Sequence, residues 1–334
     1  MVSNASRALR ILTWHVHGNY LHYLSYCPHE FFVPVDEARS SRFAGTPPGF
    51  PWRSNVHEIP TEQVPRLEFD CILFQKRQNY TTDQYDMLSE AQRRLPKIYL
   101  EHDPPRANPT DQRHIVDDPD VLIVHVTDFN RLMWDCGRAP VRVIEHGVAP
   151  LEEVRWSGEM RRGIVVVNNL SLRGRRLGAD IFEQVRWQVP LDLAGVASES
   201  FGGLGDVPST RLASLMSSYR FFFNPIRYTS LGLAVCEAMM LGMPIVGLAT
   251  TELATVVENG VSGWIDTCVD RLVDTMRDLL DDPAKAKLWG EGARRRALAR
   301  FNINRFAADW DDTFRLVTRT RATKEAAVPA GSIL

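Results

Sequence analysis

The stretch that decides the fold runs from Phe221 to Val246 and reads FFFNPIRYTSLGLAVCEAMMLGMPIV. An apolar run, a turn with proline and glycine, an apolar helical stretch and a second apolar run predict a buried strand, a helix and a buried strand in succession. Glu237 is the only charged residue of the predicted helix, and both faces of that helix are apolar. Carboxylates are seldom fully buried without a partner, so the pattern indicates that Glu237 holds something.

The start of this helix offers backbone N–H groups, which bind anions and phosphate above all. Thr229 or Ser230 can cap the helix, and Gly232 lets a ligand come close to the backbone. Ser230 and Glu237 fall on one helix face, so a ligand with a phosphate and hydroxyl groups, such as a nucleotide sugar, would satisfy both ends. The alternative is a capped core helix in which Glu237 pairs with an arginine such as Arg227.

Residues 229–263, together with Pro225, resemble the nucleotide-sugar-binding segment of the retaining glycosyltransferases of family four, which have the GT-B fold. The positions that match the pattern of that family in register are Pro225, Gly232, Leu233, Glu237, Ala238, Gly242, Pro244, Val246, Gly260 and Gly263. The resemblance implies two Rossmann-like, doubly wound domains of α/β class that face each other across a cleft. It also implies a nucleotide diphosphate sugar as the donor.

The chain departs from the family pattern at several positions. The first glutamate of the family falls on Thr229, and its serine falls on Ile226. Its Gly-Gly pair falls on Thr251 and Glu252, and a later glutamate falls on Thr255. These departures keep a second interpretation open, a degenerate module that binds nucleotide or glycan without transfer. A sugar-nucleotide epimerase of GT-B fold is a third interpretation, which is disfavoured because the Glu237 segment matches the transferases better.

The composition agrees with a two-domain globular enzyme, since 334 residues suffice for two full cores. The 39 basic and 41 acidic residues nearly balance, so we expect no nucleic-acid partner. The five cysteines are scattered, without a spacing typical of zinc sites or disulfide frameworks, and we expect a cytoplasmic protein. We expect neither a signal peptide nor a membrane span, because no apolar segment approaches ~20 residues. Peripheral association with a membrane stays open.

Apolar runs that alternate with amphipathic stretches predict the order of the elements. The predicted strands are Arg10–Val16, Phe69–Phe74, Lys97–Leu100, Val121–Val126, Val141–Ile144, Gly163–Val167, Pro190–Ala194, Arg220–Phe223, Met243–Val246 and Gly263–Ile265. The predicted helices are Asp83–Leu95, Asp128–Cys136, Leu177–Trp187, Ser209–Ser218, Leu231–Leu241, Glu252–Glu258, Val269–Leu280, one from Pro283 and Asn304–Thr318.

We divide the chain into an N-terminal Rossmann-like domain over residues 1–150 and a C-terminal Rossmann-like domain over residues 151–303. The resemblance implies that the first is the acceptor side and that the second binds the nucleotide sugar. It also implies that a helix over residues 304–321 crosses back to the first domain. Residues 322–334 are small and polar, and we expect a disordered tail there. The proline-rich segment 28–65 is expected to form an ordered loop near the acceptor side.

Two further candidates follow predicted strands of the first half. Gly18 comes after the first strand, where its backbone can approach a ligand, and His102 comes after the strand Lys97–Leu100, beside the proline-stiffened loop at Pro104. The resemblance implies that Gly18 lies in a glycine loop that faces the donor phosphates, and that His102 points toward the donor sugar. The alternatives are an ordinary turn for Gly18 and, for His102, a surface histidine that is bonded to Asp103.

An arginine-rich turn follows the predicted strand Gly163–Val167. The family has an arginine and a lysine here that clamp the diphosphate. Asn169 falls where that arginine would be, Arg176 best matches the lysine, and Arg173 can replace the missing arginine. Arginine suits bidentate contact with phosphate, although a solvated basic turn competes with this interpretation for Arg175.

The predicted function is that of a retaining glycosyltransferase. Arg173, Arg176 and the N–H groups near Leu231–Leu233 would hold the leaving diphosphate, with Thr229, Ser230 and Gly232 beside them. Glu237 would accept hydrogen bonds from the ribose, and His102 would contact the donor sugar. The partners would be a nucleotide-sugar donor and a glycan, lipid-linked or small-molecule acceptor. We expect neither a cofactor nor a metal, since no Asp-x-Asp motif stands at a strand end that faces the cleft.

Overall fold

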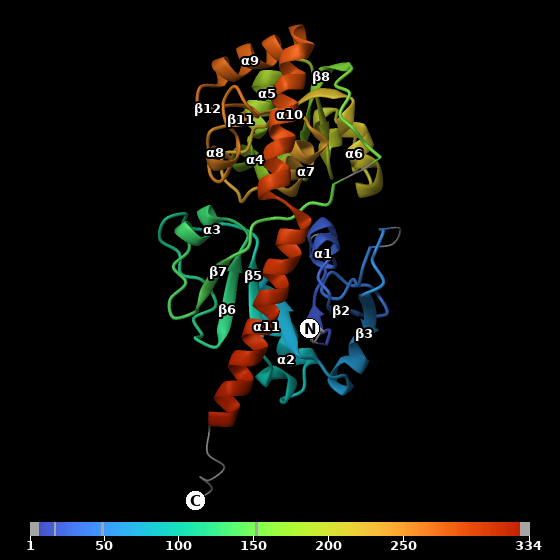
Figure 1. The fold of residues 1–334 in the computed structure, drawn as a ribbon, viewed down its shortest axis with the longest axis vertical. Helices are drawn as coiled ribbons and strands as arrows, with labels where there is room; N and C mark the ends of the chain where they lie inside the picture. The colour runs from blue at the N-terminus through green and yellow to red at the C-terminus, as the bar shows by residue number, and fades with distance from the viewer. Residues whose placement is uncertain (1–6, 17, 48–49, 151–152, 328–334) are drawn as a thin grey trace, which may run out of the picture. The chain divides into compact units, whose positions relative to one another are not determined.

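The computed structural model describes residues 7–16, 18–47, 50–150 and 153–327. The chain forms two compact units (Figure 1). Unit 1 comprises the residues up to Ile144 and those from Asn304 onward, and unit 2 comprises Glu145–Ile303. The boundary between the first segment of unit 1 and unit 2 therefore lies a few residues before the expected boundary at residue 150.

The sheet of unit 1 has seven parallel strands in the order β3-β2-β1-β4-β5-β6-β7. The strands are β1 Arg10–Thr13, β2 Glu30–Val35, β3 Val56–Pro60, β4 Cys71–Phe74, β5 Lys97–Glu101, β6 Val121–His125 and β7 Val141–Val143. The helices are α1 Gly18–Leu24, α2 Gln84–Met87, α3 Asp128–Met133 and α11 Ile303–Ala327. The chain reverses its direction across the sheet between β1 and β4, which is where such sheets bind ligands.

The expectation of a loop throughout the proline-rich segment 28–65 is wrong, because this segment contributes β2 and β3. Phe31-Phe32-Val33 is a short buried run, and the prolines around it conceal the strand pattern. Pro34 is tolerated in β2 because its nitrogen faces the β1 side, beyond the last register pair of β1 and β2 at Phe32. Between the two strands the chain forms the expected loop, of which residues 48–49 lie outside the described residues.

The predicted helix Asp83–Leu95 is also wrong in its extent. A π-helix at Asn79–Asp83 leads into α2, and the backbone becomes extended at Leu88 before a short 3₁₀ helix at Gln92–Arg94. The break is stabilised by reciprocal hydrogen bonds, since Ser89 N donates to Gln92 Oε1 and Gln92 N donates to Ser89 Oγ. Periodicity alone cannot distinguish this side-chain turn from a continuing helix.

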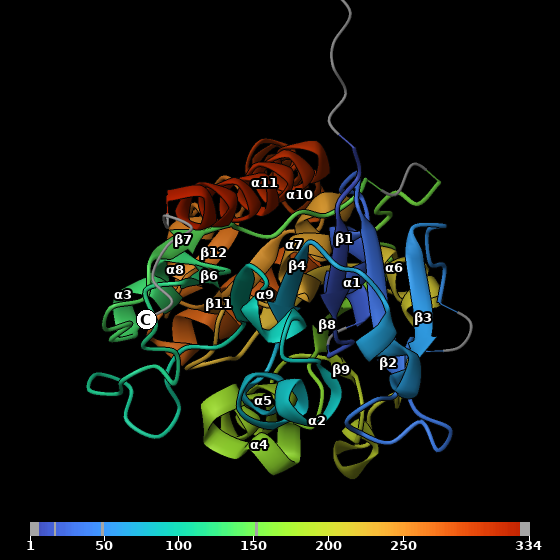
Figure 2. The ribbon, with the colours of Figure 1, turned by 90° about the horizontal axis from the view of Figure 1, so that it is seen from below.

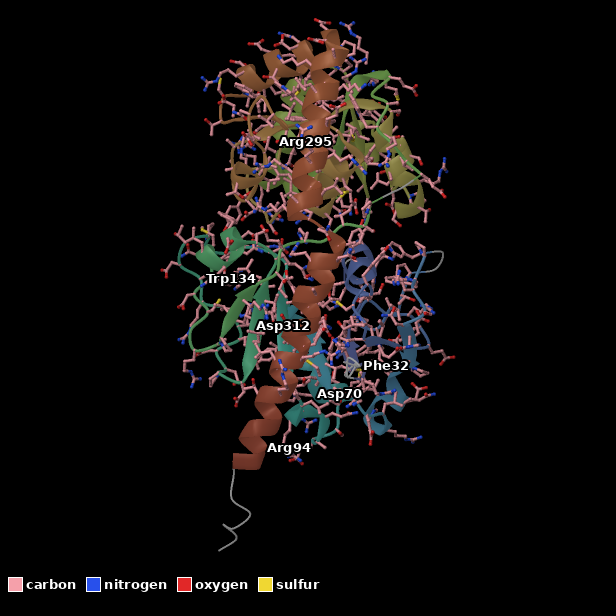
Figure 3. All side chains as sticks on the ribbon, viewed as in Figure 1. Phe32, Asp70, Arg94, Trp134, Arg295 and Asp312 are labelled. Carbon is pink, nitrogen blue, oxygen red and sulfur yellow. The ribbon has the colours of Figure 1, made fainter. Side chains whose placement is uncertain are left out.

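The last helix belongs to unit 1 and packs along its sheet (Figures 1 and 2). Trp310 is fully buried and donates its indole N–H to Tyr20 Oη at 3.2 Å. Arg142 of β7 forms an ion pair with Asp312 at 2.8 Å, and Figure 3 labels Asp312 on the helix. The helix continues to Ala327, so the expected disorder from residue 322 is wrong for residues 322–327; residues 328–334 lie outside the described residues.

Unit 2 contains a five-stranded parallel sheet in the order β12-β11-β10-β8-β9. The strands are β8 Met160–Val166, β9 Leu191–Ala194, β10 Tyr219–Asn224, β11 Ile245–Leu248 and β12 Gly263–Asp266. The helices are α4 Leu170–Leu177, α5 Ala179–Arg186, α6 Ser209–Ser217, α7 Leu233–Leu241, α8 Leu253–Val256, α9 Val269–Asp281 and α10 Pro283–Arg300. The two sheets confirm the α/β class and the doubly wound arrangement.

The middle of this sheet is built from strands that are buried on both faces. Phe221, Phe222 and Phe223 of β10 are each at most 1% exposed. Gly163 of β8 lies so close to the Phe221 ring that a Cβ there would come within 2.2 Å of it. This close packing fixes β8 beside β10, and therefore fixes the two loops that leave their carboxyl ends.

Candidate functional site

The candidate site of unit 2 lies where β8 and β10 end side by side. The chain leaves β8 toward β9 on one side and later returns to β10 on the other, so these two ends mark the switch point of the sheet. Crevices at such points bind ligands in doubly wound sheets. Arg173 and Arg176 follow β8, whereas Thr229, Ser230 and the α7 helix follow β10. The structure thus brings the predicted residues of unit 2 to one edge.

The α7 helix begins later than the sequence predicted. Gly232 is the N-cap, the helix starts at Leu233, and neither Thr229 nor Ser230 caps it. Gly232 is exposed, and a Cβ built there would meet nothing within 4 Å. The hydroxyl of Ser230 is buried and has no hydrogen-bond partner within the described part of the chain. An uncapped helix N-terminus with an unsatisfied hydroxyl beside it is suited to an anionic ligand.

Glu237 stands one turn farther along α7 and is 7% exposed. Burial, together with the charge of Glu237, raises the pKa of the neighbouring Cys236 thiol well above its ordinary value. The alternative in which Glu237 pairs with Arg227 is not observed, because Arg227 has another partner. Its guanidinium binds Asp180 through both nitrogens, at 2.5 and 2.8 Å. The helix therefore keeps a buried carboxylate near an open N-terminus.

The arginine-rich turn forms α4 and its junction with α5. The backbone of α4 is kinked at Gly174, where φ is 56° and ψ is −139°. Arg173 and Arg176, on either side of the kink, are half-buried, whereas Arg175 is exposed and pairs with Asp180 at 2.6 Å. Only Arg175 therefore matches the alternative of a solvated basic turn.

The same turn contacts the β10–α7 loop directly. The carbonyl oxygen of Arg176 accepts hydrogen bonds from the backbone nitrogens of Arg227 and Tyr228, both at 3.1 Å. Gly178 has a φ of 82°, and a Cβ there would lie 2.0 Å from the Pro225 carbonyl oxygen. Glycine is thus required where this corner approaches the end of β10. The contact places the Arg176 backbone beside the residues that lead to the open end of α7.

Asn169, which stands where the family has an arginine, has a structural role. It is the N-cap of α4 in the left-handed region, with a φ of 55°. Asparagine adopts this conformation more readily than most residues. Its backbone nitrogen donates to the Val196 carbonyl oxygen at 2.7 Å, and Asn168 Oδ1 accepts from Val196 N at 2.9 Å. The two asparagines therefore bind the end of β9 to the end of β8.

The β11–α8 loop contains residues that the sequence interpretation missed. Thr251 keeps a left-handed backbone, with a φ of 50°, at a position where the family pattern has glycine. Glu252 is buried and pairs with Arg300 at 2.6 Å, and Thr255 Oγ1 donates to Glu252 Oε1 at 2.5 Å. Burial lowers the pKa of Arg300, but Glu145 and Glu252 outweigh it and raise the pKa above its ordinary value. The carboxylate of Glu252 at the second position of the missing Gly-Gly pair was the available sequence signal.

In unit 1, Gly18 and His102 stand at the carboxyl edge of the sheet, as predicted. Gly18 is the first residue of α1, which the sequence did not predict, and His102 directly follows β5. His102 Nε2 lies 3.2 Å from Gln75 Oε1, and the Tyr20 ring meets the imidazole edge-on, with centroids 5.0 Å apart. The Asp103 carboxylate pairs with Arg106.

Gln75, which follows β4, is a site residue that the sequence interpretation missed. Its amide nitrogen donates to Thr13 Oγ1 at 2.9 Å and to the Trp14 carbonyl oxygen at 2.7 Å. The amide oxygen must then face His102 and accept from Nε2–H, which makes Nδ1 the acceptor of the neutral imidazole. Gln75 therefore fixes both the orientation and the tautomer of His102.

The loop between β2 and β3 packs its aromatic residues on the β1–α1 region. Phe50 and Trp52 stack with centroids 4.6 Å apart, Trp52 meets His15 edge-on, and Phe50 meets His22 edge-on. Burial, with a smaller effect of the Arg53 charge, lowers the pKa of His22. The described part of the expected loop thus lies over the carboxyl end of β1.

The described residues lack both a metal cluster and a membrane-spanning helix. They contain no group of three or more His, Cys, Asp or Glu side chains that could hold a metal ion. Within the same residues, every helix is too short or too polar to cross a membrane.

Comparison with known proteins connects this geometry to a family. Residues 198–296 match the model described as Glycosyl transferases group 1, whereas a search of curated proteins found no match. A sucrose-phosphate synthase from Thermosynechococcus elongatus has a similar structure, with a TM-score of 0.68 and 16% identity over 93% of this chain and 100% of that one. HepE from Anabaena in complex with UDP gives a TM-score of 0.65 and 15% identity, over 92% of this chain and 100% of that one.

A third similar structure is AviGT4, a glycosyltransferase involved in avilamycin A biosynthesis. Its TM-score is 0.60 and its identity is 17%, over 93% of this chain and 98% of that one. The chain therefore has the GT-B fold, and residues 198–296 of unit 2 match the group 1 glycosyltransferase model.

Proposed function

We propose that the protein is a retaining glycosyltransferase that uses a nucleotide diphosphate sugar. The observation that carries the proposal is the uncapped N-terminus of α7, with the buried Glu237 one turn away and the Arg176 turn beside it. Backbone N–H groups suit a diphosphate, and a buried carboxylate suits the hydroxyls of a ribose. HepE in complex with UDP and with UDP-glucose is consistent with this class of donor.

In this proposal the protein acts mainly by positioning the donor and by stabilising the charge that develops on the leaving group. Arg173, Arg176 and the N–H groups at the start of α7 bind the diphosphate as the glycosidic bond breaks. Glu237 accepts hydrogen bonds from the ribose. His102, oriented by Gln75, contacts the donor sugar. The acceptor is a glycan, a lipid-linked molecule or a small molecule that binds on the side of unit 1.

A screen with radiolabelled UDP-, GDP-, ADP- and TDP-sugars tests this proposal. We expect slow hydrolysis of one donor without acceptor, and transfer when acceptor glycans or glycosides are added. Proton NMR of the product should show that the anomeric configuration of the donor is kept. An inverted product would contradict the retaining mechanism, and a changed sugar on an intact diphosphate would indicate an epimerase.

Thr229 favours a second candidate, a module that binds nucleotide without transfer, because a threonine stands where the family has an acid. If transfer is native, Thr229→Glu should reduce activity with the native donor, since the longer charged side chain fills space that the sugar uses. Thr229→Gln provides a control of similar size without the charge. If Thr229→Glu created or raised transfer from a common hexose donor, the binding module would be the better interpretation.

A further inference from the structure

Two consecutive residues at the boundary of unit 2 are connected to two different loops of the candidate site, one directly and the other through Arg300. Glu145 is the first residue of unit 2, and its carboxylate accepts from Arg300 Nε at 2.8 Å. His146 is 5% exposed, and its Nε2 donates to the carbonyl oxygen of Leu231 at 2.8 Å. Leu231 directly precedes the N-cap of α7. One end of this dipeptide therefore holds the β10–α7 loop.

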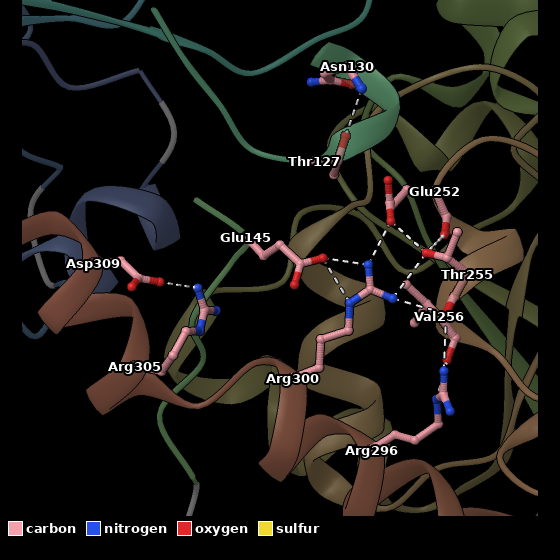
Figure 4. A network of polar contacts seen from close by, with 10 residues as sticks. All are labelled: Thr127, Asn130, Glu145, Glu252, Thr255, Val256, Arg296, Arg300, Arg305 and Asp309. Carbon is pink, nitrogen blue, oxygen red and sulfur yellow. Dashed lines mark hydrogen bonds and ion pairs between the residues drawn. The ribbon is translucent and has the colours of Figure 1, made fainter. Parts of the chain in front are cut away.

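Arg300 connects Glu145, the other residue of the dipeptide, to the β11–α8 loop (Figure 4). Its guanidinium binds the carboxylate of Glu252 at 2.6 Å, and both the carbonyl oxygen and the hydroxyl of Thr255 at 3.0 Å. The side chain of Glu252 is only 3% exposed, so this carboxylate depends on Arg300. The left-handed Thr251 immediately before Glu252 also needs a fixed environment to persist.

The second passage of the chain between the units is bonded to the first. Val148 N donates to the carbonyl oxygen of Phe301 at 2.9 Å, and Val148 forms an isolated bridge with Asn302. Arg300 directly precedes this pairing, and unit 2 ends at Ile303. The residues that enter unit 2 and those that leave it are thus joined at the point where both loops are attached.

We infer that Glu145, His146 and Arg300 form a linker clamp that positions the β10–α7 and β11–α8 loops as one body for donor binding. These three are positioning residues, because their recorded contacts are with the loops and the linker. The effect on the donor rests on the proposed function, whereas the coupling of the two loops does not.

Hydrogen exchange of the free full-length protein tests the coupling without any ligand. His146→Ala should raise exchange in residues 249–256 as well as in its own loop. Arg300→Lys, which cannot bind two carboxylates in the same way, should raise exchange in residues 228–234 as well as in its own loop. If each variant changes only the loop that it touches, the clamp is overturned. Circular dichroism before the measurement shows whether each variant is folded.

Two control variants separate the clamp from local effects. Arg296→Ala removes bonds to Thr255, Val256 and Glu258 but none to the linker, so it should affect residues 249–256 alone. Thr250→Val removes the direct bond between the loops, in which Thr250 Oγ1 donates to the Ile226 carbonyl oxygen at 2.9 Å. His146→Ala should still raise exchange in residues 249–256 when it is combined with Thr250→Val. If that increase disappears in the double variant, the coupling belongs to Thr250 and the clamp is overturned.

Calorimetric binding of UDP, GDP, ADP and TDP tests the effect on the donor site. For the nucleotide that the wild type binds most tightly, His146→Ala and Arg300→Lys should each weaken binding by about tenfold, and Arg296→Ala by less than about twofold. His146→Gln, whose amide nitrogen can take the position of Nε2 and donate to the Leu231 carbonyl oxygen, should recover most of the affinity. If no nucleotide binds the wild type while the exchange effects are present, the proposed function fails and the clamp stands. Unchanged affinity in both variants would overturn the role of the clamp in donor binding.

Discussion

The β10–α7 and β11–α8 loops leave neighbouring strands of one sheet, yet they treat their polar groups in opposite ways. The first ends in an uncapped helix, with a buried Ser230 hydroxyl that has no partner in the described part of the chain. The second binds its own carboxylate, Glu252, to Arg300 and Thr255. Under the proposed function, the loop with unsatisfied groups binds the ligand, and the loop with satisfied charges supports it.

Arg300→Ala should produce the largest effect, because it removes the guanidinium that pairs with Glu252 at 2.6 Å and leaves that carboxylate buried. We expect a loss of about 3–5 kcal/mol in the free energy of unfolding, measured by urea denaturation followed by tryptophan fluorescence. The matched control, Arg296→Ala, should cost much less, because its ion-pair partner Glu258 is 57% exposed. Equal losses would show that the supporting loop does not depend on its buried charge pair.

Glu237→Ala should act on binding rather than on stability. If Glu237 binds the ribose, its removal should weaken nucleotide binding by about 1.5–3 kcal/mol, which isothermal titration calorimetry can measure. Glu237→Gln should retain part of the affinity, because the amide oxygen still accepts a hydrogen bond. A folded Glu237→Ala variant with unchanged affinity would contradict the ribose assignment and remove the reason to call the first loop a ligand loop.

Replacing Arg173 and Arg176 together with alanine should separate phosphate binding from nucleoside binding. We expect about 1–2 kcal/mol more loss for a nucleoside diphosphate than for the matching nucleoside, since only the former carries charges for the guanidinium groups. Arg175→Ala is the control, because Arg175 is exposed and paired with Asp180. Equal losses for the two ligands would mean that the arginines only shape the turn.

The sequence predicted the elements whose physics is local. Buried strands such as β10 appear as continuous apolar runs, and Glu237 was conspicuous because nothing else in its helix is charged. The β2 strand was missed because of Pro34. A proline is tolerated there only because the pairing of β2 with β1 ends at Phe32, and the sequence alone does not show where this pairing ends. The start of α7 was misplaced because suitable capping residues were present but unused.

The supporting loop could not be predicted, because its partners are distant in sequence. Arg300 is 48 residues from Glu252 and 155 from Glu145, and an arginine at a helix end carries no sign of either contact. Gln75 was missed for the same reason, since its three partners lie at the carboxyl ends of β1 and β5 and become neighbours only in the sheet.

The smallest effect concerns the strain in the supporting loop. Thr251 has a φ of 50°, and a β-branched residue in the left-handed region costs about 1–2 kcal/mol, which glycine would avoid. Glycine in turn loses more backbone entropy on folding, so Thr251→Gly should raise the free energy of unfolding by only about 0.5–1 kcal/mol. Thr250→Gly is the matched control and should destabilise the protein, because Thr250 has no such strain and bonds to Ile226. Urea denaturation of both variants gives the comparison.

If Thr251→Gly stabilises the fold but weakens nucleotide binding, the supporting loop uses its strain to hold a shape that the ligand needs. If it destabilises the fold, the Glu252 pair does not hold this backbone under strain, and the contrast between the loops would be one of charge alone.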